Sequence, residues 1–381
     1  MVNYMQYRQF GKDKFNVSVL GFGAMRLPIL NNDMKQIDQP LATAMIRRGI
    51  EGGINYVDTA YPYHGGTSEA LVGQALKGGY REKVRLADKM PTWLVNSRDD
   101  MDRLLAEQLA RLDDKRIDYY LLHSLNRGVW NKMKELGVLR WAKKQMARGT
   151  IGSLGFSFHG PCSDFIKICD DHDWDFCQIQ YNFMDTTTQA GLKGLKHAAS
   201  RGISVIVMEP LKGGRLAQPP EQVKTILDAG DGGSPVSWAL RWVWNDSKVP
   251  LLLSGMSTME QVEENLKIAD QARAGSFSAE ELKTIDRVRS LYNRMVDINC
   301  TNCKYCLPCP AGVNIPRNFE LYNDGYRYGN FGNPAFFYWN WFKPAERAEN
   351  CINCGVCEKK CPQGISIRAE LKKVREALAK K

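Results

Sequence analysis

The 381-residue sequence predicts an α/β fold, a (β/α)8 TIM barrel, followed by a small cysteine-rich domain. Eight short apolar runs recur along the first three quarters of the chain, and helical patterns separate them, which together predict the barrel. Eight of the eleven cysteines lie in the last quarter, which predicts a second domain. We therefore expect a barrel at residues 1–290 and a second domain at residues 291–381.

The eight apolar runs are short and continuous, as in strands that are buried on both faces. They are residues 17–25, 55–60, 84–90, 117–124, 152–158, 176–182, 204–210 and 250–256. Strands that alternate with helices favour a closed barrel, with its active site at the carboxyl ends of the strands. An open doubly wound sheet is the alternative, but "GFGAMR" lacks the G-x-G-x-x-G expected after its first strand.

One segment between the runs, "SRDDMDRLLAEQLARL", shows the helical pattern clearly. Its apolar residues form a single stripe made of Met101, Leu104, Leu105, Leu109 and Leu112. Ser97 is the expected N-cap, and acidic residues follow in the first turn, where they complement the helix dipole.

Composition and charge narrow the functional class. No run of about 18 apolar residues occurs, so no membrane-spanning helix is predicted. The start "MVNYMQYRQFGKDKF" lacks the apolar core of a signal peptide, so we expect a cytoplasmic protein.

The formal charge of +10 is compatible with a solvated basic surface or with a docking face for an acidic redox partner. A dense Lys/Arg block is missing, which argues against nucleic-acid binding.

Polar residues follow three of the predicted strands. Asp58 closes the second strand, Lys89 the third and His123 the fourth, and Tyr63 lies five residues after Asp58. Barrel geometry brings such positions to one mouth. The pKa of a free tyrosine is about 10, and a nearby ammonium lowers it. Together, these four residues suit a reaction in which a carbonyl oxygen is protonated while hydride is added to the carbonyl carbon. A single Asp or His at a strand end, by contrast, more often has a structural role.

These residues resemble the aldo-keto reductase superfamily over roughly the first 290 residues. The matching segments, in order, are "VSVLGFGAMRLP", "NYVDTAYPYHGGTSEALVG", "LADKM", "DYYLLHS" and "GTIGSLGFS". The resemblance implies that Tyr63 is the general acid, that Lys89 and Asp58 tune it, and that His123 orients the carbonyl. The substrate would be a small carbonyl compound or an alcohol.

The resemblance also implies NAD(H) or NADP(H), bound in an extended form across the barrel mouth. Ser157 and Gln178 match the carboxamide contacts, the loop "PLKGG" with Gly213 and Gly214 matches the pyrophosphate cradle, and "VEEN" matches the adenine contacts. The expected cofactor contacts are Met25, Ser157, Gln178, Met208, Leu211, Gly213, Gly255, Glu264 and Asn265.

Several positions depart from the family pattern. Phe158 replaces the usual asparagine, and Met208 stands where the family stacks a tyrosine on the nicotinamide. The usual Lys, Ser and Arg that bind the 2′-phosphate fall on Gly255, Met256 and Gln261. Without these cations we expect NADH to serve at least as well as NADPH. The altered nicotinamide site also leaves room for a different redox cofactor such as a flavin, although no residue indicates one directly.

The tail contains "CTNCKYCLPCP" and "CINCGVCEKKCP". The second run is C-x2-C-x2-C-x3-C-P, and in two-cluster ferredoxins its fourth cysteine ligates the other cluster. One [4Fe–4S] cluster is predicted at Cys300, Cys303, Cys306 and Cys361. The other is predicted at Cys351, Cys354, Cys357 and Cys309. Two zinc sites are the alternative, but zinc usually uses separated C-x2-C pairs.

The spacer between the runs, with "PRNFELYNDGYRYG", resembles an α-helical ferredoxin-like domain. The remaining cysteines, Cys162, Cys169 and Cys177, are expected to be buried thiols without a ligand role.

Three hypotheses for the function follow. In the first, the chain reduces an aldehyde or ketone with NAD(P)H, or oxidises the alcohol, and its clusters exchange electrons with a partner or have a structural or sensing role. In the second, it couples NAD(P)H or a flavin to a ferredoxin- or flavodoxin-type partner. In the third, the barrel is a scaffold in an electron-transfer protein, which the intact Tyr63, Lys89, His123 and Asp58 set argues against.

Overall fold

The computed structural model describes residues 5–380, and the chain packs as two compact units. The first unit comprises Met1–Ala217 and Ser234–Ala279, and the second comprises Gln218–Gly233 and Glu280–Lys381. These units are defined by packing alone, so the domain boundary expected after residue 290 stays a prediction.

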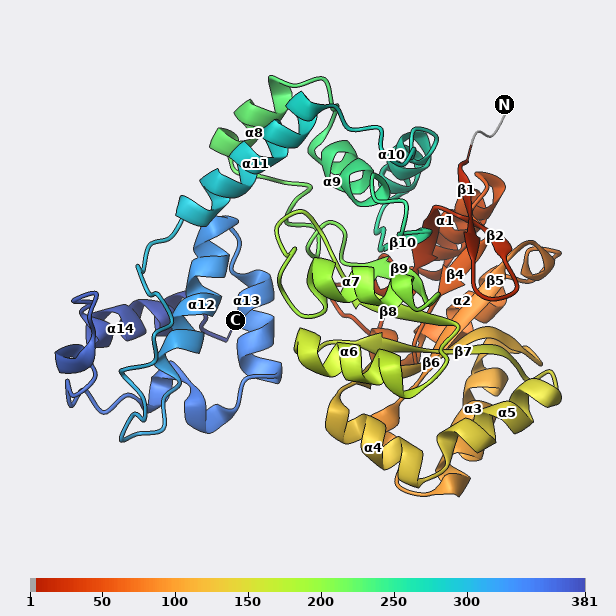
Figure 1. The fold of residues 1–381 in the computed structure, drawn as a ribbon, viewed down its shortest axis with the longest axis horizontal. Helices are drawn as coiled ribbons and strands as arrows, with labels where there is room; N and C mark the ends of the chain where they lie inside the picture. Colours follow the sequence, from red (N-terminus) through yellow and green to blue (C-terminus); the bar gives the residue numbers. More distant parts are fainter. Residues whose placement is uncertain (1–4, 381) are drawn as a thin grey trace. The chain divides into compact units, whose positions relative to one another are not determined.

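In the first unit, eight parallel strands close into a barrel in the order β10-β3-β4-β5-β6-β7-β8-β9 (Figure 1). The barrel strands are β3 (Leu20–Gly23), β4 (Tyr56–Asp58), β5 (Arg85–Met90), β6 (Ile117–Leu125), β7 (Ile151–Phe158), β8 (Phe176–Gln180), β9 (Ser204–Met208) and β10 (Leu251–Ser254). Each strand overlaps one of the eight apolar runs, so the predicted (β/α)8 fold is confirmed.

A two-stranded hairpin precedes the barrel, with β1 (Tyr7–Phe10) antiparallel to β2 (Phe15–Ser18). This hairpin was not predicted, and the strand predicted at residues 17–25 joins the end of β2 to β3. Phe10 is fully buried, and its ring centroid lies 5.1 Å from that of Tyr119 and 5.7 Å from that of Phe176. These rings belong to the first halves of β6 and β8. They fill the amino-terminal end of the barrel, which leaves the carboxyl end for a site.

Helices alternate with the barrel strands. They are α1 (Gln39–Glu51), α2 (Ser68–Ala75), α3 (Arg98–Leu112), α4 (Arg127–Glu135), α5 (Val138–Ala147), α6 (Cys162–Asp171), α7 (Gly191–Ser200), α9 (Pro235–Trp244) and α10 (Met259–Ala269). The predicted helix is α3, and Ser97 caps it in a capping box with Asp100. Four residues of its stripe are buried and Leu109 is half-buried, but the same face also buries Gln108.

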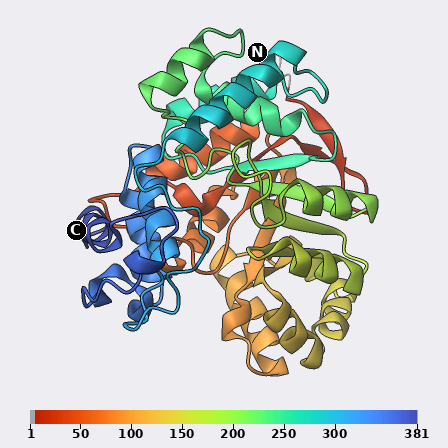
Figure 2. The ribbon, with the colours of Figure 1, turned by 60° about the vertical axis from the view of Figure 1, so that its left-hand side comes forward.

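The second unit is helical (Figure 2). It contains α8 (Glu221–Asp228), α11 (Ala279–Arg294), α12 (Ile315–Arg327), α13 (Gly332–Asn340) and α14 (Ile367–Ala377). Residues 280–380 include no strand, in agreement with the predicted α-helical domain. Its core joins Phe319, Tyr338 and Leu371 to Cys357 from the second cysteine run. Over residues 5–380, none of the helices combines the length and the apolar character that crossing a bilayer requires.

Two of the three scattered cysteines behave as predicted. Cys169 and Cys177 are buried, and burial raises the pKa of Cys169 to about 12, so both thiols stay protonated. Cys162 is a correction. It begins α6 at the outer surface of the barrel, where it is only half-buried.

Candidate active site and cluster region

Lys89 lies at the centre of the candidate active site, on β5, with its side chain fully buried. Its Nζ donates hydrogen bonds to Asp58 Oδ1 at 2.5 Å, to the Thr59 carbonyl oxygen at 2.8 Å and to the Tyr63 hydroxyl at 3.3 Å. Asp58 ends β4, and Tyr63 begins the short 3-10 helix Tyr63–Gly66 that follows. The structure thus brings three of the four predicted catalytic residues together at the carboxyl ends of β4 and β5.

His123 lies near the end of β6, and its ring centroid is 6.3 Å from that of Tyr63 and 5.2 Å from that of Trp93. Its Nδ1 is buried and has no hydrogen-bond partner among the described side chains and backbone groups. Burial, with a smaller effect of Lys89, holds the pKa of His123 well below its usual value, so the imidazole is neutral. A buried nitrogen without a partner is unfavourable, and a hydrogen bond to a bound molecule would relieve this.

The pKa of Tyr63 is raised, whereas the sequence predicted that Lys89 would lower it. The ammonium of Lys89 lowers the pKa of Tyr63 as expected, but burial has the larger effect, and the pKa is raised overall. Burial also lowers the pKa of Lys89, yet the Asp58 carboxylate and Tyr63 outweigh it, so Lys89 stays charged. The resting site therefore holds a protonated tyrosine beside an ammonium.

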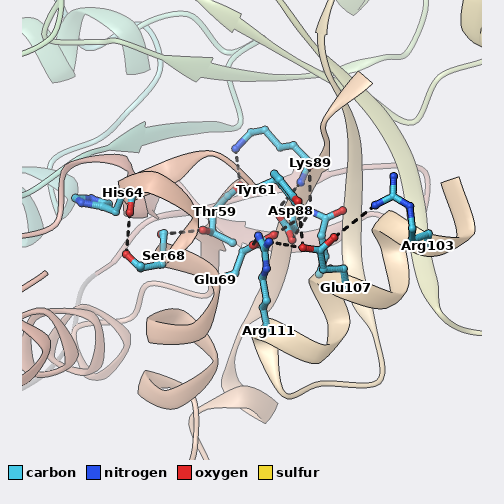
Figure 3. Close-up of polar contacts among 12 residues, drawn as sticks. Thr59, Tyr61, His64, Ser68, Glu69, Asp88, Lys89, Arg103, Glu107 and Arg111 are labelled. Carbon is cyan, nitrogen blue, oxygen red and sulfur yellow. Dashed lines mark hydrogen bonds and ion pairs between the residues drawn. The ribbon is translucent and has the colours of Figure 1, made fainter. Parts of the chain in front are cut away.

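A buried polar network behind Lys89 was missed by the sequence analysis (Figure 3). Gln108 Nε2 donates to Asp88 Oδ2 at 2.8 Å, to Glu69 Oε1 at 3.1 Å and to the Lys89 carbonyl oxygen at 3.0 Å. Arg111 Nη1 donates to Glu69 Oε2 at 2.8 Å. Since Glu69, Asp88 and Gln108 are all fully buried, this network fixes the backbone that carries Lys89.

Two buried carboxyl groups, those of Glu69 and Asp88, accept hydrogen bonds in this network. Burial, followed by the charge of Glu69, raises the pKa of Asp88 well above its usual range. Burial thus favours the neutral form of Asp88, and Arg111 forms an ion pair with Glu69 at 2.8 Å. Among the described residues, Asp58 is the one carboxylate that forms an ion pair with the Lys89 ammonium.

Replacing Gln108 with leucine tests the network. The change leaves the hydrogen-bonding oxygens of Asp88, Glu69 and Lys89 without this donor, so we expect the free energy of unfolding to fall by about 3 kcal/mol. We expect kcat to fall as well, because the backbone of Lys89 loses a support. Urea unfolding and steady-state kinetics measure the two effects.

Gln145→Leu is the matched control for this change. Gln145 is also a buried helical glutamine, but it donates to Asp102, away from Lys89. A loss of kcat as large in Gln145→Leu as in Gln108→Leu would contradict a specific role of the network.

The predicted carboxamide contacts lie at the ends of β7 and β8 and are tied to the catalytic set. Ser157 Oγ accepts a hydrogen bond from the Ser124 N–H at 2.8 Å, directly after His123. Gln178 Nε2 donates to Asp58 Oδ2 at 3.2 Å. Both side chains are buried, and their contact with a nicotinamide stays a prediction.

The loop after β9 carries the predicted pyrophosphate cradle. Met208 and Leu211 are half-buried, and Gly213 and Gly214 have left-handed φ angles of 69° and 93°. A Cβ added at Gly214 would meet nothing within 4 Å, so this turn borders open space. The loop is anchored by Lys212, whose Nζ donates to Asp185 Oδ2 at 2.7 Å, a pair that the sequence analysis missed.

The two residues predicted to contact the adenine form hydrogen bonds within the first unit. Glu264 accepts a hydrogen bond from Ser234 at 2.6 Å, and buried Asn265 donates to Ser254 at 2.8 Å. Met25 is exposed at the end of β3. Phe158, which replaces the family asparagine, packs its ring 5.2 Å from that of Phe165 in the core between β7 and α6.

The second unit contains a small cavity of about 20 Å³ that is partly open to solvent. The cysteines that line it are Cys300, Cys303, Cys306 and Cys361, together with apolar side chains such as Ile315 and Phe319. These are the four cysteines predicted for one cluster. Within residues 5–380, no three His, Cys, Asp or Glu side chains converge on a position for a single metal ion.

The pKa values of the cysteines are affected by cysteines of both runs. Burial raises the pKa of Cys300, and nearby Cys303 and Cys361 add to the effect. Burial likewise raises the pKa of Cys357, and Cys309 of the first run contributes to it. Each run thus has its fourth cysteine close to the other run, although Cys306 also lies near Cys357.

The sequence profile of the aldo/keto reductase family matches residues 19–290. The chain belongs to this family. A second profile, that of a 4Fe-4S dicluster domain, matches residues 299–365 of this aldo/keto reductase. The resemblance proposed from the sequence is confirmed for both parts.

Both curated proteins and solved structures include proteins that are similar to this chain over most of the barrel. L-galactose dehydrogenase from Arabidopsis thaliana is 26% identical over 313 residues, 74% of this chain and 94% of the plant protein. An uncharacterized oxidoreductase of Schizosaccharomyces pombe is 30% identical over 267 residues, 66% of this chain and 82% of that protein. An aldo-keto reductase from Bacillus halodurans (holo form) matches at a TM-score of 0.62 and 25% identity, covering 74% of this chain and 96% of its own.

Proposed function

We propose that this aldo/keto reductase reduces a small aldehyde or ketone with NAD(P)H, or oxidises the corresponding alcohol in reverse. We further propose that its cysteine-rich domain holds two [4Fe–4S] clusters for electron transfer. The observation that carries the first proposal is the buried Lys89 ammonium, held between the Asp58 carboxylate and the Tyr63 hydroxyl at the carboxyl end of the barrel. NAD(P)H dependence is the expected property of the family.

A reduced nicotinamide, when bound, supplies hydride to a carbonyl carbon. Tyr63 holds the proton that the carbonyl oxygen takes up, and its raised pKa keeps that proton in place at neutral pH. Lys89 lies 3.3 Å from the Tyr63 oxygen and stabilises the negative charge left on it. Asp58 keeps Lys89 charged, and neutral His123 donates a hydrogen bond that orients the carbonyl.

The nicotinamide would be held by residues at the ends of β7, β8 and β9. Ser157 and Gln178 offer a hydroxyl and an amide for the carboxamide, and Met208 offers an apolar surface for the ring. The open turn at Gly213 and Gly214 supports phosphate binding, because its backbone can approach a ligand closely and can offer N–H donors.

The clusters would be held across the two cysteine runs. Cys300, Cys303, Cys306 and Cys361 line one cavity, which supports them as one ligand set. Cys351, Cys354, Cys357 and Cys309 form the other set. Thiolates ligate such clusters, which carry single electrons, and a ferredoxin- or flavodoxin-type protein is the partner expected for that chemistry.

The second candidate function couples NAD(P)H or a flavin to such a partner, with the barrel as the cofactor-binding scaffold. It is favoured by Phe158, which is buried in the core where the family has an asparagine at the nicotinamide.

Anaerobic addition of NADH, and then of NADPH, to the oxidised protein with a panel of aldehydes and ketones tests the proposal. We expect one nicotinamide to be oxidised for each carbonyl compound reduced. Absorbance and EPR of the clusters are followed in parallel. Cluster reduction by NAD(P)H without turnover of any carbonyl compound or alcohol would contradict the first candidate and support the second.

A further inference from the structure

His64 directly follows Tyr63, the proposed acid, and its backbone is left-handed, with a φ angle of 52° and a ψ angle of 39°. This conformation is unfavourable for a residue with a Cβ, and it persists where the surrounding structure imposes it. Gly65 and Gly66 continue the left-handed stretch, with φ angles of 65° and 95°. Because two glycines in succession can adopt many backbone conformations, the segment after Tyr63 needs an anchor.

The side chain of His64 supplies that anchor. It is buried, and its two ring nitrogens contact two backbone groups of the loop after β3. Nε2 accepts a hydrogen bond from the Leu27 N–H at 3.2 Å, and Nδ1 lies 2.9 Å from the Met34 carbonyl oxygen. Since Nε2 is the acceptor, the proton of the neutral ring is on Nδ1 and is donated to Met34. Burial lowers the pKa of His64, which favours this neutral form.

The loop that His64 contacts is itself held together by pairing. Ile29 and Ile37 form an antiparallel bridge, and His64 bonds both to the backbone before this bridge and to the backbone within the turn that the bridge closes. The stem of Lys35, in the same turn, lies over Gly65, where an added Cβ would lie 2.7 Å from Lys35 Cγ. The two segments therefore pack against each other at the carboxyl ends of β3 and β4.

A second connection between these strand ends lies next to Lys89. Ser68 Oγ lies 2.9 Å from Thr59 Oγ1 and donates to the Ala24 carbonyl oxygen at 3.2 Å (Figure 3). The Thr59 carbonyl oxygen in turn accepts a hydrogen bond from Lys89 Nζ. The chain is thus tied to the segment after β3 both before and after Tyr63, by Thr59 through Ser68 on one side and by the next residue on the other.

We propose that His64 is a positioning residue that holds the Tyr63 hydroxyl against the Lys89 ammonium. The proposal rests on the proposed carbonyl chemistry, in which Tyr63 is the acid. The hydroxyl and the ammonium are 3.3 Å apart, so a small displacement of the 3-10 helix Tyr63–Gly66 would separate them. A displacement of about 1 Å can lower a rate by about 100-fold. His64 acts in this way through Tyr63 and not by contact with the substrate.

Three substitutions of His64 test the proposal by steady-state kinetics and calorimetric dinucleotide affinity. His64→Phe keeps a ring but removes both hydrogen bonds, so kcat for carbonyl reduction should fall by about 10- to 100-fold. Dinucleotide affinity should change little, because most of the predicted cofactor contacts lie at the ends of β7, β8 and β9. His64→Gln keeps a donor and an acceptor and should retain most of kcat. His64→Gly suits the left-handed backbone but lacks both hydrogen bonds, so it should lose kcat as His64→Phe does.

His172→Phe is the matched control. His172 lies between α6 and β8, before the amino end of its strand, and its ring centroid is 4.9 Å from that of Trp174. We expect this variant to keep the kcat of the wild-type protein. Full kcat in His64→Phe would overturn the proposal. Full kcat in His64→Gly would also overturn it, because the position would then need only a left-handed backbone.

The NMR signal of the Tyr63 ring Cζ provides a readout that does not depend on turnover. In protein with ¹³C-labelled tyrosine, this signal is assigned by its absence in Tyr63→Phe. It should shift in His64→Phe and stay in place in His172→Phe, and an unmoved signal in His64→Phe would overturn the proposal. If the wild-type protein turns over no carbonyl compound or alcohol, the proposed function fails, and the NMR comparison still tests the role of His64.

Discussion

Replacing Tyr63 with phenylalanine should lower kcat for carbonyl reduction by about 10²- to 10⁴-fold, the usual contribution of a general acid. The change removes the one hydroxyl hydrogen-bonded to the Lys89 ammonium and keeps the aromatic ring that packs near His123. Nicotinamide binding should change little, because the predicted cofactor contacts come from other strands. Single-turnover kinetics with a fixed aldehyde, with dinucleotide affinity measured separately, checks both parts.

Tyr61→Phe is the matched control. Tyr61 lies two residues away, and its hydroxyl donates to Glu107 at 3.1 Å instead of to Lys89. We expect this variant to retain kcat within about 2-fold. A loss as large in Tyr61→Phe as in Tyr63→Phe would show that disturbance of the loop, and not loss of the acid, limits the reaction.

The pH dependence of the wild-type enzyme provides a second check on Tyr63. Because burial raises the pKa of Tyr63 above its usual value of about 10, the acid form is present at neutral pH and is lost only as the pH rises through that pKa. His123 stays neutral until the pH falls well below about 6.5. Carbonyl reduction should therefore be nearly independent of pH between about 7 and 9, and a titration near pH 7 would contradict the assignment.

The barrel could be predicted because its strands are buried on both faces, which leaves continuous apolar runs such as "LLLS" of β10. The hairpin could not. Its strands are four residues each, and β1 follows the pattern "YRQF", in which Phe10 is the one buried side chain. A single buried residue gives no period, so the contact of Phe10 with the barrel interior appears only in three dimensions.

The catalytic set could be predicted because Asp58, Lys89 and His123 each lie at or near the end of a strand. The supporting network could not, since Gln108 interrupts the apolar stripe of α3 and looks like a surface position in the sequence. The same holds for His64. Its hydrogen-bond partners in the loop after β3 are 37 and 30 residues away in the sequence, and only the sheet, in which β3 pairs with β4, brings the two segments together.

The two cysteine runs allow a decisive test of how the clusters are held. With two [4Fe–4S] clusters, the protein should contain about eight iron atoms per chain. If the ligands cross between the runs, Cys300 and Cys361 belong to one cluster, as the cavity that both line suggests. The double variant Cys300→Ala/Cys361→Ala should then lose one cluster and keep about four iron atoms.

Cys300→Ala/Cys309→Ala is the reciprocal variant, with the same number of substitutions. In the crossed arrangement Cys309 belongs to the second cluster, beside Cys357, so this variant should lose both clusters and nearly all of its iron. If each run instead holds its own cluster, the two results exchange. Three cysteines spaced C-x2-C-x2-C reach three corners of a cubane, so the fourth ligand decides whether the runs depend on each other. Iron analysis, with EPR of the reduced protein to count the remaining clusters, distinguishes the two arrangements without knowledge of the substrate.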